Sequence, residues 1–241
     1  MEFYVGLHQP SDARHFERAF VSVNRLRGRR KPVGASAWIM DSGAFTEIST
    51  HGRYRHSVED YAAEIARWSG DPALLAVVAQ DYMCESWILE KTGLSVVDHQ
   101  RLTIERYDAL EPLVQDVYVM PVLQGYTVAD YLRHLQAYGD RLAPGAWVGV
   151  GSVCKRNANP LSVESILATI KRARPDLRLH GFGLKTTALA LGTIRELLHS
   201  ADSMAWSFAA RRQGRDGNSH HEARRFIERI AAQPVQLGWV F

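Results

Sequence analysis

Acidic, amide and glycine residues end or follow the apolar runs of this sequence at six places. The set is Asp41-Ser42-Gly43, Asp81, Gln124-Gly125, Gly151-Ser152, Gly183 with Lys185, and Asp202. Taken one at a time, these residues are ordinary turn or helix-cap composition. If the apolar runs are parallel strands of a barrel, however, the residues at their ends share one face, and that face carries the active site. The set therefore predicts one site built from distant parts of the chain.

The chemistry of this set complements the pyrimidine edge of guanine. The N1–H and 2-amino groups of that edge are donors that a carboxylate accepts, and O6 is an acceptor for a side-chain amide or a backbone N–H. Asp81, Gln124 and the Gly151-Ser152 turn supply this complement. We also expect Tyr82 to stack on a bound base, although packing in the core is the alternative for any aromatic residue beside a strand.

Asp41 and Asp202 remain as two further carboxylates for a reacting bond. In retaining glycoside hydrolysis, one carboxylate attacks the anomeric carbon and the other handles the proton of the leaving group. Asp41 and Asp202 can divide these roles.

Short β-rich runs must position these residues, and they alternate with helical patterns from end to end. The runs are Glu2–Leu7, Ala35–Met40, Leu74–Ala79, Val117–Leu123, Ala146–Val150, Leu177–Leu184 and Ser200–Ala205. This alternation predicts an α/β fold with a parallel sheet, either open or closed. The glycine-rich dinucleotide fingerprint is missing after the first run, where "GLHQPSDARHF" stands instead. We therefore expect a single domain over residues 1–241, a TIM-like (β/α)8 barrel, with "VQLGWVF" (235–241) as a candidate for the eighth strand.

Three of the intervening helices have clear start signals. Each begins with a Ser or Thr that is followed three places on by an Asp, which is the pattern of a capping box. The pairs are Ser57 with Asp60, Ser95 with Asp98, and Thr127 with Asp130. Apolar residues repeat at helical spacing after these starts, so each helix is expected to bury one face.

Composition narrows the class of protein. The chain has 241 residues, of which 46% are hydrophobic, so it can bury a large core. It has no run of about 18 apolar residues and no secretory signal, and its two cysteines, Cys84 and Cys154, have no zinc-site spacing. We expect a cytoplasmic protein that makes no membrane contact and holds no metal.

The basic residues are clustered, although the net charge is only +3. One cluster is "RLRGRRK" (25–31), and the other is "RRQGR" (211–215), which contains Arg211 and Arg212. Lys155 and Arg156 directly follow the Gly151-Ser152 turn. Such residues suit contacts with nucleic-acid phosphates, but a solvated surface explains them equally well.

Taken in order, these motifs resemble those of the tRNA-guanine transglycosylases. "MDSGAF" resembles the Asp-Ser-Gly-Gly-Phe segment of that family, with Ala44 in place of the second glycine, and "PVLQGY" resembles its Val-Gln-Gly-Gly. "VGVGSV" stands where the family has a Gly-Gly turn. "DSMAWSFAARR" resembles the Asp-Ser-Ala-Ser-Tyr-Ala-Leu stretch of the archaeal members, whose first aspartate is the nucleophile and matches Asp202. The resemblance extends from about residue 36 to 212.

The departures point to one branch of this superfamily. The family's zinc subdomain of three cysteines and a histidine has no counterpart, since no cysteine follows Cys154 and His220-His221 cannot supply the set. There is also no room for the RNA-binding domains of the archaeal enzymes. A short chain without zinc ligands is most similar to the DpdA family of bacteriophages and bacterial genomic islands. That resemblance implies exchange of guanine in DNA for a 7-deazaguanine, usually 7-cyano-7-deazaguanine.

The resemblance implies a mechanism and a set of roles. Asp202 is the nucleophile at C1′, and Asp41 helps to protonate the departing guanine. Ser42, Gly43, Asp81, Tyr82, Gln124, Gly125, Gly151 and Ser152 bind the base, and Lys155, Arg156, Arg211 and Arg212 contact the nucleic acid. The partners are then double-stranded DNA with a flipped-out guanine and a free 7-deazaguanine base, and no metal or redox cofactor is needed.

Two other functions fit the same residues. One is a reduced tRNA-guanine transglycosylase that works with a separate RNA-binding subunit. The other is a non-catalytic module that binds a deazaguanine or a nucleic acid. A phosphate-handling lyase fits less well, because neither a Schiff-base lysine nor a phosphate loop is evident.

Overall fold

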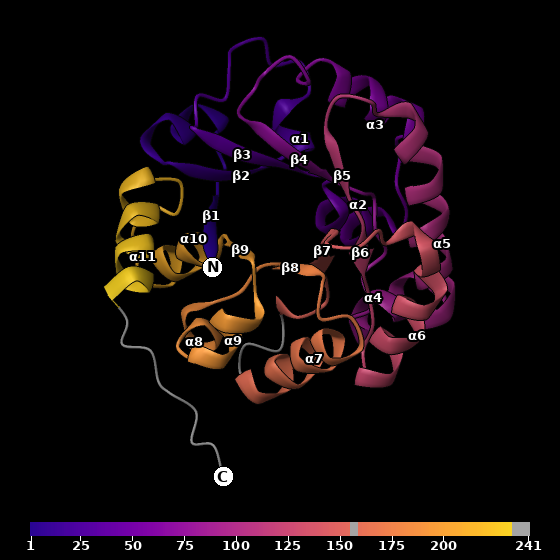
Figure 1. Ribbon diagram of the computed structural model, residues 1–241. Helices are drawn as coiled ribbons and strands as arrows, with labels where there is room; N and C mark the ends of the chain where they lie inside the picture. The colour runs from indigo at the N-terminus through magenta and orange to yellow at the C-terminus, as the bar shows by residue number, and fades with distance from the viewer. Residues whose placement is uncertain (155–158, 233–241) are drawn as a thin grey trace.

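The protein is a parallel α/β barrel in its computed structural model, which describes residues 1–154 and 159–232. The strands are β1 (Glu2–Gly6), β2 (Arg18–Ser22), β3 (Ala37–Asp41), β4 (Leu74–Val78), β5 (Tyr118–Met120), β6 (Val122–Leu123), β7 (Trp147–Val150), β8 (Arg178–Gly181) and β9 (Ser200–Ser203). They form one sheet in the order β5-β4-β3-β2-β1-β9-β8-β7-β6, and every pairing is parallel. The strands surround a common centre, as Figure 1 shows.

The two ends of this order meet at Pro121, which alone separates β5 from β6. The N–H of Ala79 donates to the carbonyl of Met120 (3.0 Å), on the β4 side. On the β7 side, the N–H of Gly149 donates to the carbonyl of Pro121 (2.9 Å). Because proline has no N–H, it interrupts the ladder and splits one strand into two short ones. The nine strands therefore occupy eight positions of a nearly closed barrel, and the predicted TIM-like fold is confirmed.

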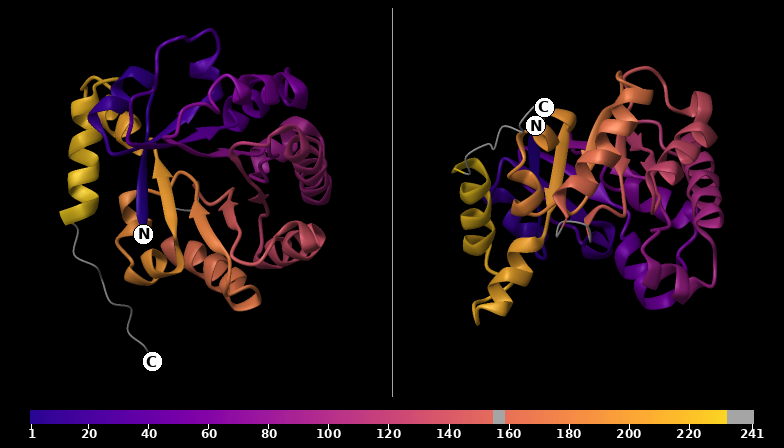
Figure 2. Two further views of the ribbon diagram at one scale, coloured as in Figure 1. Left: turned by 45° about the horizontal axis from the view of Figure 1, so that its top comes forward. Right: turned by 90° about the horizontal axis from the view of Figure 1, so that it is seen from below.

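The helices lie outside this sheet, as the two views of Figure 2 show. The longer ones are α2 (Ala44–His51), α3 (Val58–Ala66), α4 (Ser86–Thr92), α5 (Val96–Leu110), α6 (Val128–Tyr138), α7 (Pro160–Ala173), α9 (Gly192–Leu197), α10 (Ala205–Arg212) and α11 (His220–Ala232). Shorter turns are η1 (Pro10–His15), α1 (Val23–Leu26), η2 (Glu111–Leu113), η3 (Gly139–Arg141) and α8 (Thr186–Leu189). Within the described ranges, no helix has the length and apolar character that crossing a bilayer requires.

The predicted strand runs are all confirmed, but the eighth position is filled differently from our expectation. It belongs to β2, which pairs with β1 on one side and β3 on the other. The candidate at 235–241 lies outside the described residues. We missed β2 because "RAFVS" is only five residues long, begins with an arginine and directly follows Glu17, and so short a run has no decisive periodicity.

The capping boxes predicted for α3, α5 and α6 are all present. In each, the Ser or Thr hydroxyl accepts from the backbone N–H of the Asp, and the Asp carboxylate accepts from the N–H of the cap residue. A cap of this kind stabilises a helix by ~1 kcal/mol. Of these helices, α6 directly follows a strand, β6, whereas α2 lies between β3 and α3, and α4 lies between β4 and α5.

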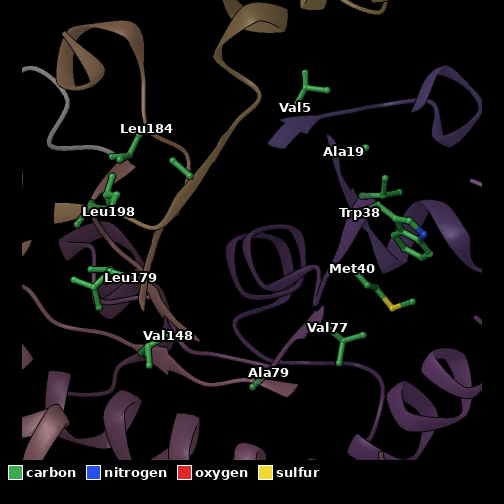
Figure 3. Packing of buried hydrophobic residues seen from close by; sticks show 14 of the residues in the cluster. Val5, Ala19, Trp38, Met40, Val77, Ala79, Val148, Leu179, Leu184 and Leu198 are labelled. Atoms are coloured by element: carbon green, nitrogen blue, oxygen red, sulfur yellow. The ribbon is translucent and has the colours of Figure 1, made fainter. Parts of the chain in front are cut away.

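Alternation along the strands sends side chains to two sides of the sheet. The outer side packs against the helices, as the labelled residues Val5, Ala19, Trp38 and Leu179 show in Figure 3. A smaller cluster fills the inside of the barrel; its buried members are Tyr4, Phe20, Ile39, Ala76, Val78, Met120, Val122 and Trp147. Because Leu179 and Ala201 belong to the outer cluster, their neighbours His180, Ser200 and Asp202 face the barrel interior.

Candidate active site

Asp202 lies inside the barrel on β9, opposite Tyr4 of β1 in the register. Its side chain is buried, with a residue exposure of 6%. The backbone N–H of Gly183 donates to Oδ1 (3.1 Å), and Nε2 of His180 lies 3.3 Å from the same oxygen. Both contacts therefore hold Oδ1, and the carboxylate has a fixed orientation in a site that is largely closed to water.

Asp41 is the last residue of β3 and pairs in register with Ser22 of β2. The N–H of Gly43 donates to Oδ2 of Asp41 (3.1 Å). Gly43 has a φ of +77° and is the N-cap of α2, a conformation that favours glycine. The Asp-Ser-Gly turn thus turns the chain from strand to helix while it holds the carboxylate.

Burial and, to a lesser extent, the negative charge of Asp202 raise the pKa of Asp41 from 3.8 to about 6. Hydrogen bonds from Ser22 and Gly43 oppose this shift. A carboxyl group with a pKa near 6 can hold and release a proton close to neutral pH. Because the charge of Asp202 acts on Asp41, the two carboxylates lie in the same region of the barrel.

A second group of polar side chains follows β4, β6 and β7, and we call it the amide cluster: Asp81, Glu85, Gln124 and Ser152. Nε2 of Gln124 donates to Oδ2 of Asp81. The Ser152 hydroxyl lies 2.7 Å from Oε1 of Gln124 and 3.0 Å from Oε2 of Glu85, and because it has one proton it donates to one of them at a time. All four residues are buried.

Glu85 was not among the predicted site residues. Its signal was present in "QDYMCE", where it stands four places after Asp81. A site role was not predicted for Glu85, because it directly precedes α4 and its position is typical of an ordinary helix start. Only the fold brings it to Ser152, 67 positions away in the chain.

Burial raises the pKa of Asp81 from 3.8 to about 7. The hydrogen bond from Gln124 opposes this shift, whereas the charge of Asp41 adds to it. The pKa of Asp81 therefore depends on Asp41, one of the two catalytic candidates. An ionised Asp81 accepts hydrogen bonds only, which suits a ligand edge made of donors.

The backbone of Gln124 is fixed on both sides. Its N–H donates to Nδ1 of His134 (2.8 Å), and its carbonyl accepts from Nε2 of Gln100 (2.7 Å). Burial lowers the pKa of His134 to about 4, so the ring is neutral and Nδ1 can accept. Neither His134 nor Gln100 was predicted, because each contacts the backbone of Gln124 and supports the site only through that residue.

Gly151 makes room for the Gln124 side chain. A Cβ atom on Gly151 would lie 2.1 Å from Nε2 of Gln124 and 2.6 Å from its Cδ, which no native contact tolerates. The carbonyl of Gly151 accepts from the hydroxyl of Tyr131 (2.6 Å). Among the described residues, Ser152 is the single non-glycine residue with a positive φ, at +54°, a conformation that costs ~1 kcal/mol.

Gly125 and Tyr82 complete the predicted base-binding residues. A Cβ atom on Gly125 would lie 2.9 Å from Cβ of Asp130, so the start of α6 packs closely against this turn. Tyr82 is 6% exposed and packs edge-on against Tyr54 and His99, at centroid distances of 5.6 and 5.5 Å. A stacking role for Tyr82 stays a prediction.

The predicted phosphate-binding residues lie around α10. Arg211 and Arg212 are exposed at its end, and Nη2 of Arg211 is 3.5 Å from Nε2 of His8. The pKa of His8 is lowered by burial and then by the charges of Arg211 and Arg25. This coupling brings the two basic clusters of the sequence to one side of the molecule. Lys155 and Arg156 lie outside the described residues.

Comparison with known proteins gives one finding. Residues 1–230 match the family model DpdA, described as DeoxyPurine in DNA protein A. No curated protein matches the chain.

Proposed function

Because the chain belongs to the DpdA family, which places it among enzymes of deoxypurine modification in DNA, we propose that it exchanges guanine in DNA for a 7-deazaguanine. We take 7-cyano-7-deazaguanine as the incoming base. The observation that carries this proposal is the pair of coupled carboxylates, Asp41 and Asp202, at the mouth of a barrel whose neighbouring loops hold the amide cluster. A glycosidic bond that is broken and remade needs both kinds of group.

In the first half-reaction, Asp202 attacks C1′ of a guanine nucleotide that has left the base stack. We assign the attack to Oδ2, because Gly183 and His180 hold Oδ1. The new bond joins Oδ2 to C1′, the C1′–N9 bond breaks, and its electron pair leaves with guanine. Asp41 gives its proton to the departing base, which its pKa of about 6 allows. The product is a covalent glycosyl-enzyme.

The second half-reaction reverses these steps with another base. The 7-deazaguanine loses its N9 proton to the Asp41 carboxylate, and N9 attacks C1′. The C1′–Oδ2 bond breaks, and Asp202 leaves as a carboxylate. One base replaces another with no net change in protons or electrons, so both aspartates return to their starting state.

The amide cluster would recognise both bases by the edge that they share. An ionised Asp81 accepts from N1–H and the 2-amino group, and an amide or backbone N–H donates to O6. Substitution at position 7 lies on the other side of the base and leaves this edge unchanged. The same contacts therefore serve the leaving guanine and the entering deazaguanine.

DNA contacts would come from the rim of the barrel. Extruding a base from the duplex costs a few kcal/mol. Contacts of the protein with the extruded base, and with the space that it leaves in the duplex, must offset this cost. Phe45 and Trp87 follow β3 and β4, are 51% and 38% exposed, and lie edge-on with centroids 6.1 Å apart. Arg212 lies 5.9 Å from the ring of exposed Phe208 on α10. Exposed aromatic rings beside arginines suit unstacked bases and phosphates.

Release of labelled guanine from DNA tests this function. Double-stranded DNA with radiolabelled guanine is incubated with the protein, with and without 7-cyano-7-deazaguanine, beside matched tRNA and an Asp202→Ala control. We expect release from DNA that requires both the deazaguanine and Asp202. Release from tRNA alone would assign the protein to RNA modification. Binding of the base with no release from either polymer, and no trapped adduct, would instead make the protein a binding module.

A further inference from the structure

A chain of hydrogen bonds runs through the barrel interior and ends at Asp202. Nε1 of Trp147 donates to Oγ of Ser200 (2.8 Å). The same oxygen lies 2.8 Å from Nδ1 of His180, whose Nε2 lies 3.3 Å from Oδ1 of Asp202. The residues come from β7, β9 and β8, and His180 and Ser200 have no exposed surface.

The chemistry of its two ends fixes the direction of this chain. The indole N–H of Trp147 can only donate, so Ser200 accepts there. A carboxylate at the other end can only accept, so Nε2 of His180 carries a proton. In the neutral ring, Nδ1 is then the acceptor, and the Ser200 hydroxyl donates to it. Each donor in the chain, the Trp147 N–H, the Ser200 O–H and the His180 Nε2–H, therefore donates to the next group in the direction of Asp202.

Packing keeps the His180 ring in place. It stacks on Phe20 with a centroid distance of 5.6 Å and an interplanar angle of 16°. Phe182 covers it edge-on at 4.9 Å, and Trp147 lies edge-on at 6.1 Å. The ring therefore cannot turn away from Asp202 without disturbing the filling of the barrel.

We propose that His180 is the positioning residue of the nucleophile, held as its Nε2–H tautomer by Ser200 and Trp147. The proposal rests on the exchange reaction proposed above. His180 and the Gly183 N–H would fix Oδ1, so that Oδ2 faces C1′ in the first half-reaction. In the second, the His180 N–H would stabilise the carboxylate charge that returns to Asp202 as the C1′–Oδ2 bond breaks.

The tautomer can be measured without any substrate. A long-range 1H–15N correlation spectrum of the 15N-histidine protein reports which ring nitrogen carries the proton, and the His180→Phe spectrum identifies the ring. We expect Nε2 to be protonated and Nδ1 to be free of a proton, and we expect Ser200→Ala to shift the ring toward a tautomer mixture. A wild-type ring protonated on Nδ1 alone, or on both nitrogens, would overturn the proposal.

The rate of covalent adduct formation gives the second readout. His180→Phe keeps an aromatic ring for stacking but lacks the donor, whereas the side-chain amide of His180→Gln restores an N–H toward Oδ1. We expect His180→Phe to slow adduct formation by about 10- to 100-fold, to leave the KM for the deazaguanine unchanged, and to be partly rescued in His180→Gln. If His180→Phe does not fold, the rate of adduct formation is measured in Ser200→Ala instead, and we expect a smaller decrease in that variant.

The two proposals fail in different ways. Wild-type protein that forms no adduct and releases no guanine contradicts the exchange function, while the tautomer spectrum still decides the hydrogen-bond chain. Wild-type exchange that is lost in Asp202→Ala but unchanged in both His180→Phe and Ser200→Ala would overturn the role of His180 alone.

Discussion

The side-chain amide of Gln124 donates to the carboxylate of Asp81, although 43 positions separate the two residues and they follow different strands. The oxygen of the same amide lies 2.7 Å from the Ser152 hydroxyl, which follows a third strand. One glutamine therefore joins three loops and fixes the position of the carboxylate that we assign to base recognition.

Gly151→Ala should displace Gln124. The new Cβ would lie 2.1 Å from Nε2 of Gln124, so the amide must leave its place between Asp81 and Ser152. We expect the KM for the deazaguanine to rise by about 10- to 100-fold, with a smaller effect on DNA binding. Steady-state exchange with varied base concentration measures it. Gly70→Ala is the matched control for glycine loss, since its Cβ meets no atom within 4 Å and, like Gly151, it has no positive φ. An unchanged KM in Gly151→Ala would contradict the binding role of Gln124.

The rate of guanine release should depend on pH in a bell-shaped way. The first half-reaction needs Asp41 protonated, and its pKa of about 6 makes this form scarce as the pH rises. Base recognition needs Asp81 ionised, and its pKa of about 7 makes that form scarce as the pH falls. We expect a maximum between pH 6 and 7, measured as kcat/KM from single-turnover release.

Asp41→Asn serves as the control for that profile. It removes the acid, so we expect a lower rate throughout and loss of the decline on the alkaline side. A profile of Asp41→Asn that keeps the wild-type alkaline decline would show that another group supplies the proton.

Asp41→Asn should also stabilise the folded protein above pH 6. The folded-state pKa of Asp41 is raised from 3.8 to about 6, so the favourable contribution of the protonated form is complete below pH 3.8 and is lost as the pH rises through 6. At pH 8 the fold carries an ionised, partly buried carboxylate that is repelled by the charge of Asp202, and the neutral amide removes that cost. We expect the gain to be about 1–2 kcal/mol larger at pH 8 than at pH 5, because part of the contribution is already lost between pH 3.8 and pH 5. Urea unfolding at both pH values checks the sign, and an equal gain at the two would contradict it.

Phe45→Ala and Trp87→Ala should weaken DNA binding without loss of fold. Both rings are exposed, Phe45 on α2 after β3 and Trp87 on α4 after β4. Stacking on an unpaired base is worth about 1–3 kcal/mol. We expect each variant to raise the Kd for DNA by at least fivefold, with the KM for the free base unchanged. Fluorescence anisotropy with labelled DNA measures this. Leu113→Ala is the control, since Leu113 is 49% exposed but lies in η2, which precedes β5. Equal effects of all three substitutions would exclude a specific DNA surface.

In the hydrogen-bonded chain from Trp147 to Asp202, the sequence predicted a role for Asp202 but not for His180. Asp202 could be found because it lies in the predicted strand run Ser200–Ala205 and matches a motif. His180 stands inside "LRLHGFGL", where a lone histidine in a strand reads as core filling. Nothing in that stretch tells that the ring faces a carboxylate 22 positions later.

The sequence by itself determined the alternation of strands and helices, the three capping boxes and the list of acids and amides at strand ends. These are local properties, since periodicity, capping and turn composition act over a few residues. The tertiary structure decided that β2 fills the eighth position, that Glu85 and His180 join the site, and that the pKa values of Asp41 and Asp81 rise to about 6 and 7. Burial and the field of neighbouring charges depend on atoms far apart in the chain, so they exist only once the barrel has closed.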